Sequence, residues 1–305
     1  MRPVLRRLLA IPPLVLAVAT LAFFLMRAAP GGPFDRERAP ASPQIEATLK
    51  ARYHLDEPLW KQYARFLGGL CRADLGPSFK YRHHSVGDIL AQTLPVSLAL
   101  GSLAFGFAVG TGIPIGFLAA VHRGRWPDWL ASFLVLVGVC IPTFVLAPLL
   151  VLWFGLGLGW FPVALWGSLP QAVLPTVALG LYFAARISRL VREGVADTLR
   201  APFIVAARAK GLDEFTLLRR HALRPALLPV VSFAGPMLAD LLTGSFVVEK
   251  VFQLPGTGAF FVNGFFSRDY PMVLGLVILY SALLLVLNLA ADLAYRWIDP
   301  RVRHV

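Results

Sequence analysis

Few residues of this 305-residue chain have the types and spacing that chemistry requires. His83 and His84 are adjacent, and adjacent imidazoles lack the spacing of a metal-ligand set, so a solvated loop pair is favoured. Cys71 lies in a polar segment and Cys140 inside an apolar block, so we do not expect them to form a disulfide. The sequence therefore predicts no metal centre and no disulfide framework.

Nucleotide chemistry is also missing from the sequence. No segment reads G-x-x-x-x-G-K-[ST], the loop whose backbone cradles phosphates, and no glycine-rich turn joins a strand to a helix. The apolar blocks hold neither a Ser/His/Asp set nor a set of metal ligands. We therefore expect a protein that is not an enzyme, requires no cofactor and has no nucleotide-binding site of its own.

One carboxylate is notable because it falls inside an apolar block. Asp240 lies in the block Ala226–Val248. A carboxylate within a membrane span is costly unless it faces the interior of a helix bundle or water. Asp240 could line a translocation path and attract a cationic group of a solute, or it could hydrogen-bond to a neighbouring helix. The sequence leaves both interpretations open.

The richest polar segment is Pro202–Pro229, which lies between two apolar blocks. Pro202 suits the first position of a helix, where a missing N–H costs nothing. Gly211 can close that helix in the left-handed conformation, and Asp213 can cap the next one. Helical spacing places four residues on one face: Phe203, Ala206, Ala207 and Lys210. Two short helices joined by a glycine turn are suited to docking onto a partner.

The elements that position these residues are membrane spans. Hydrophobic residues make up 57% of the chain and charged residues 15%, against about 25% charged in soluble domains. A helix crosses the hydrocarbon core in about 20 residues, and six apolar blocks approach or exceed that length. These blocks are Leu8–Met26, Leu94–Val121, Trp129–Leu156, Ala172–Ile187, Ala226–Val248 and Val273–Leu293. The fold class predicted is an all-α polytopic membrane protein with six transmembrane helices.

The distribution of positive charge predicts the orientation. The net charge of +12 comes largely from basic residues beside the apolar blocks, which favours the positive-inside bias over nucleic-acid binding. Nine Lys and Arg lie between positions 186 and 224, whereas none lies between 157 and 171. Both termini and the Pro202–Pro229 segment are therefore expected in the cytoplasm. The segment Arg27–Gln92 would then form a periplasmic subdomain after the first helix, with helical patterns at Ile45–His54 and Pro58–Leu70.

An ordered series of motifs resembles a known family, the inner-membrane permeases of ABC importers. The segment Ala207–Leu212 (ARAKGL) with Ala206 resembles their EAA loop, although Val205 stands where the loop has Glu. The prolines of the loop's second half are displaced to Pro225 and Pro229. Further motifs resemble the oligopeptide and dipeptide branch, specifically its B-type permease: Arg27–Pro33 (RAAPGGP), Gly76–Tyr81 (GPSFKY), Arg220–Leu223 (RHAL), Arg268–Pro271 (RDYP) and Ile298–Arg301 (IDPR).

The resemblance implies the type-1 ABC importer permease fold. It implies a first helix and periplasmic segment over 1–93, a transmembrane domain over 94–297, and a cytoplasmic tail over 298–305. The coupling (EAA) loop would cover about 190–225. Its ATPase-docking residues would be Phe203, Ile204, Ala206, Ala207, Lys210 and Gly211.

The resemblance also implies partners and a location. The chain would form half of a path for peptides, with oligopeptides expected, across the bacterial inner membrane. Its partners would be a second permease, two ATP-binding subunits and a periplasmic or lipid-anchored peptide-binding protein, with no nucleic acid. The alternatives are import of another solute by the same fold (dipeptides, nickel or glutathione) or an ion-coupled secondary transporter. The latter favours paired intramembrane carboxylates and inverted repeats, neither of which is found.

Overall fold

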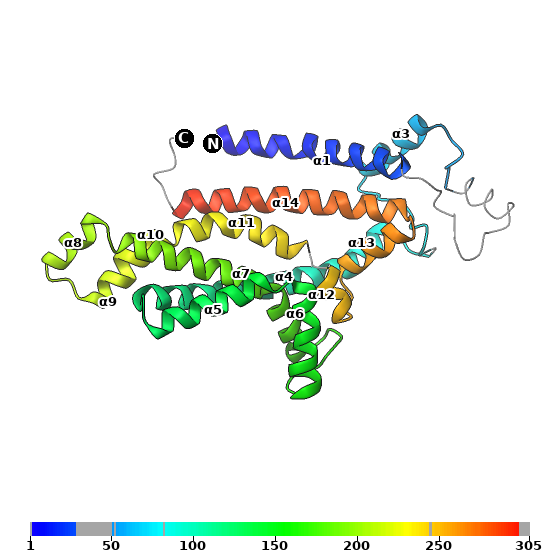
Figure 1. Cartoon of the computed structure of the whole chain (residues 1–305). Helices are drawn as coiled ribbons and strands as arrows, with labels where there is room; N and C mark the ends of the chain where they lie inside the picture. The colour runs from blue at the N-terminus through cyan, green and yellow to red at the C-terminus, as the bar shows by residue number, and fades with distance from the viewer. Residues whose placement is uncertain (1, 29–50, 52, 82, 244–245, 299–305) are drawn as a thin grey trace. The chain divides into compact units, whose positions relative to one another are not determined.

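The structure is a computed structural model that describes residues 2–28, 51, 53–81, 83–243 and 246–298. Figure 1 shows a chain built from helices, and no named strand occurs within these residues. The helices are α1 (Arg2–Ala28), α3 (Leu59–Leu70), α4 (Val86–Val121), α5 (Trp126–Cys140), α6 (Thr143–Leu150), η1 (Val151–Gly157), α7 (Leu169–Thr198), α8 (Pro202–Ala209), α9 (Glu214–Thr216), η2 (Leu217–Ala222), α10 (Leu223–Ala226), α11 (Leu228–Leu242), α12 (Phe246–Val251), α13 (Thr257–Phe266) and α14 (Tyr270–Ile298).

The helices form two compact units that interleave along the chain. The first unit joins Met1–Pro95 to Gly256–Leu283, and the second joins Val96–Pro255 to Leu284–Val305. The long helices α4 and α14 therefore contribute to both units. The domain boundaries expected from the sequence remain predictions.

The first unit contains α1, α3, α13 and the beginnings of α4 and α14. Its buried core joins the start of α4 to the start of α14 through side chains that include Val86, Met272 and Leu276. A second set of contacts holds α3 against α1, because the Phe23 ring lies 5.2 Å from that of Tyr63, between ring centroids. The helix expected over Pro58–Leu70 is confirmed as α3. Most of the further helical pattern at Ile45–His54 lies outside the described residues.

The second unit packs through small residues. A β-carbon added to Gly112 of α4 would lie 2.6 Å from the carbonyl oxygen of Ala184 in α7, and one added to Gly116 would collide with the Ser188 carbonyl. Apolar side chains gain little by meeting in a membrane, so helices there associate where small residues let their backbones approach closely. The glycines of α4 allow this approach to α7.

The third apolar block, Trp129–Leu156, does not form one continuous helix. The helix breaks after Cys140, and the segment before the break makes an angle of 108° with the segment Thr143–Gly157 that follows. Figure 1 shows α6 turning away from α5. Ile141 is extended because the proline ring that follows disfavours the helical conformation of the residue before it, and Pro142 is extended as well.

Four of the other five apolar blocks each fall in one long helix, and the remaining block, Ala226–Val248, is divided among α10, α11 and α12. By length and composition, the described residues hold five helices able to cross a membrane, or six spans if the bent pair counts as one. Four helices are longer than their apolar blocks, namely α1, α4, α7 and α14; for example, α4 begins at Val86 and α7 continues to Thr198. The all-α class expected from the sequence is confirmed, and the six expected spans agree with the count in which the bent pair is one span.

Candidate functional site

The polar segment folds as its sequence predicts. Pro202 is the first residue of α8, and Ala201 before it is extended. The helix ends in a Schellman motif, in which the Leu212 amide donates to the Ala207 carbonyl at 3.3 Å and the Gly211 amide to the Arg208 carbonyl at 2.9 Å. This motif requires a left-handed residue, and Gly211 has φ +79°.

The chain reverses after Gly211 and starts a second helix through a cap. The Asp213 carboxylate accepts a hydrogen bond from the Thr216 amide at 2.8 Å, which lowers the pKa of Asp213. The two helices are also joined by an ion pair, because Arg208 Nε donates to Glu214 Oε1 at 2.7 Å. This hydrogen bond lowers the pKa of Glu214 and raises that of Arg208. Both carboxylates are charged at neutral pH, so the cap and the exposed ion pair both connect the two sides of the turn.

The six predicted coupling residues differ in exposure: four are exposed, one is half-buried and one is buried. Phe203 is 51% exposed, and Ala206, Lys210 and Gly211 are also exposed. Ala207 is half-buried. The Ile204 side chain is completely buried within this chain, so it anchors α8 and presents no surface to a partner.

Sequence reasoning did not single out Phe215, an exposed apolar side chain on this loop. Phe215 of α9 is 69% exposed, and Val205 of α8 is 61% exposed. Exposed apolar side chains that gather on one short loop are suited to contact with a partner. The sequence contained a sign of this exposure, because Phe215 directly follows Asp213 and Glu214, the two acidic residues at the start of α9.

Asp240 lies on the open side of α11. Its neighbours Ser232 and Pro236 at helical spacing are exposed as well, whereas Met237 and Leu241 are buried in the second unit. Thr243 Oγ1 donates to the backbone carbonyl of Asp240, not to its side chain. Within the described part of the chain, no hydrogen bond joins the carboxylate to a neighbouring helix. The exposed stripe is what a path-lining position requires.

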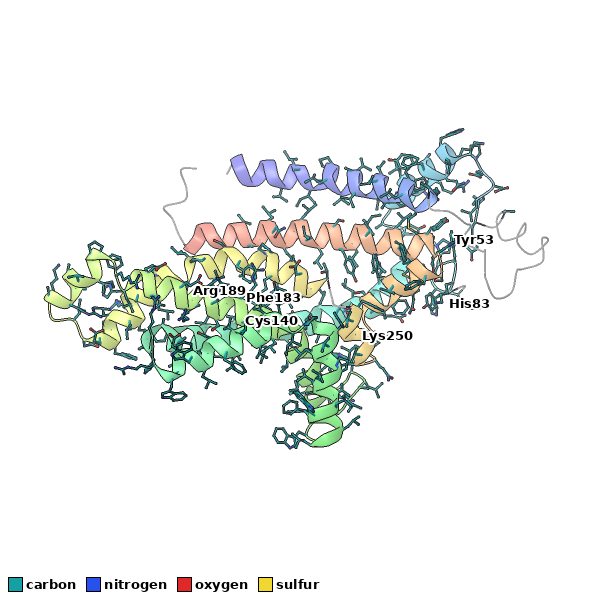
Figure 2. The ribbon with its side chains drawn as sticks, viewed as in Figure 1. Tyr53, His83, Cys140, Phe183, Arg189 and Lys250 are labelled. Carbon is teal, nitrogen blue, oxygen red and sulfur yellow. The ribbon has the colours of Figure 1, made fainter. Side chains whose placement is uncertain are left out.

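The structure also brings together an ion pair that the sequence did not predict. Arg192 of α7 donates to the Asp128 carboxylate from Nε at 2.6 Å and from Nη2 at 3.0 Å. The Gly124 amide donates to the same carboxylate at 2.9 Å. Asp128 is 6% exposed, and the two residues are 64 positions apart in the sequence. The pair fixes the start of α5 to α7, which is the helix that leads into α8; Figure 2 labels Arg189 on the same helix.

A second unpredicted cluster surrounds Asp269 in the first unit. This buried carboxylate caps α14 by accepting from the Met272 amide at 3.3 Å, and it accepts from the Phe79 and Lys80 amides at 3.1 and 3.2 Å. The Ser78 hydroxyl donates to it as well. The motifs Gly76–Tyr81 and Arg268–Pro271, distant in sequence, are therefore one structural feature.

The chain resembles known proteins along its whole length. Residues 112–304 match the family described as binding-protein-dependent transport system inner membrane component. An oligopeptide transport system permease protein, OppB of Haemophilus influenzae, is 46% identical over 99% of both chains. OppB of Escherichia coli K12 is 44% identical and a dipeptide permease, DppB of Bacillus subtilis 168, is 41% identical, with at least 98% of each chain covered.

A solved structure of the MetNI methionine ABC transporter in an inward-facing conformation shares the fold. It has a TM-score of 0.54 and 24% identity, over 69% of this chain and 96% of that one. The type-1 ABC importer permease fold expected from the motifs is thereby confirmed. The chain belongs to the family of binding-protein-dependent transport system inner membrane components.

Proposed function

We propose that this chain is one of two membrane-spanning subunits of a peptide importer and that α8 is its coupling helix. The observation that carries the proposal is the geometry of α8, in which small and apolar side chains are exposed on a short helix that a glycine turn closes. An ATPase subunit docked there pushes or pulls on α7 and α11, which flank the loop on either side in the chain. The resulting change between two packed arrangements opens the path to one side or the other.

The chain is an integral multi-pass protein of the inner membrane. The proposed orientation places both termini and α8 in the cytoplasm, because the basic residues concentrate on that side. The partners are a second permease, two ATP-binding subunits that hydrolyse the nucleotide, and a peptide-binding protein. Oligopeptides are proposed as the substrate because the relatives at 44–46% identity are named for oligopeptide transport; the relative at 41% keeps dipeptides as the alternative.

Asp240 is proposed to line the path. Its exposed carboxylate on α11 would attract the cationic amino terminus of a peptide. This role concerns the solute and not the ATPase, so it can fail while the coupling function of α8 stands.

The coupling function is tested by blocking the exposed face of α8. Ala206→Trp places an indole where we expect a partner groove to approach, and the variant should no longer co-purify with the ATPase subunits. Arg123→Trp is the matched control, because it adds the same side chain at an exposed position outside the Pro202–Pro229 segment. Co-purification of Ala206→Trp at the wild-type level would refute docking on this face.

A further inference from the structure

The first unit contains a cavity of about 270 Å³ that the coupling and path functions do not use. It lies among the ends of α1 and α3, the Asp74–Phe79 segment and the start of α14; Tyr53, one of its lining residues, is labelled in Figure 2. Pockets for drug-sized ligands measure roughly 300–1,000 Å³. This cavity is therefore suited to one residue of a chain molecule and not to a whole peptide.

The walls of the cavity are largely aromatic. Phe66 of α3, Phe79 and Tyr270 all line it, together with Leu274 of α14. Tyr270 is nearly buried, and the Phe79 ring lies 6.1 Å from it, between centroids. Such walls favour an apolar or aromatic side chain over a polar one.

Two arginines line the cavity; Arg65 is paired with Glu57, whereas Arg27 is set against the aromatic wall. Its guanidinium carbon lies 3.5 Å from the centroid of the Phe23 ring, and its Nε donates to Gln62 Oε1 at 3.1 Å. The amide nitrogen of Gln62 donates to two backbone carbonyls, those of Leu55 and Glu57. These two bonds hold the Gln62 side chain so that its Oε1 faces Arg27. The guanidinium is therefore positioned before any ligand arrives.

The carboxylates near the cavity are engaged elsewhere. Glu57 pairs with Arg65 at 2.8 Å and with His54 at 3.3 Å. Asp74 accepts a hydrogen bond from the Gly76 amide at 2.9 Å. No carboxylate in the described ranges pairs with Arg27, and a guanidinium carries five N–H donors suited to binding a carboxylate with two parallel bonds.

We propose that this cavity binds the carboxylate and the apolar side chain of a peptide's C-terminal residue. The guanidinium of Arg27 holds the carboxylate and the aromatic walls hold the side chain. The choice of a peptide as the source of that carboxylate rests on the proposed transport function. In the proposed orientation the cavity opens on the outer side of the membrane, where the substrate arrives.

The test uses the full-length chain in nanodiscs of zwitterionic phosphatidylcholine. The probe is N-acetyl-alanyl-phenylalanine, and its C-terminal amide is the control ligand; binding is measured by isothermal titration calorimetry. We expect the amide to bind at least tenfold more weakly than the acid. Arg27→Gln should lower acid binding to the level of the amide, and Arg27→Lys should give an intermediate loss. Lys61→Gln, which removes an exposed charge outside the cavity, should change nothing.

Three results would overturn the proposal. The acid and the amide could bind equally, Arg27→Gln could bind the acid like the wild type, or anionic phosphatidylglycerol could displace the acid and identify the cavity as a lipid site. If Arg27→Gln fails to fold, the contrast between acid and amide in the wild type and in Arg27→Lys decides. Failure of the proposed peptide transport would appear instead as a loss of uptake by the assembled importer, with this binding contrast intact.

Discussion

Replacement of Gly211 tests whether the closed turn after α8 transmits force. The residue has φ +79°, and a β-carbon added there would meet nothing within 4 Å. Substitution therefore causes no collision within this chain, and its whole cost is the backbone strain of a left-handed residue. That strain is about 1–2 kcal/mol for an ordinary L-residue, and 1.4 kcal/mol is about a tenfold change in an equilibrium.

Three variants separate strain from side-chain volume. Asn adopts the left-handed conformation more readily than other L-residues, so Gly211→Asn should stay near the wild type. Gly211→Ala should populate the closed turn about tenfold less, which corresponds to the middle of that range of strain. Gly211→Val should be worst, because a β-branched side chain is least compatible with positive φ. Asn and Val are similar in size, so their difference reports on the backbone.

The assay is peptide uptake per ATP hydrolysed by the importer reconstituted with its partners in proteoliposomes. We expect all three variants to reach the membrane at wild-type levels, with coupling that declines in the order Asn, Ala, Val. Wild-type coupling in Gly211→Val would refute the role of the turn. Equal losses in the Asn and Val variants would show that side-chain volume at the partner interface matters, and not the backbone conformation.

Three further changes test the second unit. Asp240→Asn should slow uptake of peptides with a cationic amino terminus but not of N-acetylated ones; unchanged uptake and preference would exclude the path role. A double-mutant cycle of Asp128→Asn and Arg192→Gln should give a coupling free energy of about 1 kcal/mol after allowing for the partial exposure of Arg192, measured in denaturant unfolding; additive effects would contradict the pair. Gly112→Leu should destabilise the fold by about 1–3 kcal/mol, because its side chain meets a carbonyl of α7, whereas Gly110→Leu, with open space around it, should be tolerated in the same measurement.

The sequence determined the features that depend on neighbouring residues. Apolar blocks of span length predicted the long helices, because a membrane span must satisfy its backbone hydrogen bonds internally. Pro202, Gly211 and Asp213 predicted the start of α8, its left-handed end and the cap of α9. Each of these signals acts through the backbone within a few positions, so no tertiary information was needed.

The tertiary structure decided which side chains meet and which side of a helix stays open. The bend after Cys140 was signalled locally by Pro142, but its angle of 108° depends on the packing of α6. Helical spacing placed Phe203 on an exposed face, yet only the fold could show that Ile204, one position away, is buried. The Asp128–Arg192 pair and the cavity around Arg27 join residues distant along the chain. Their contacts arise when whole helices pack, and a single sequence carries no record of that approach.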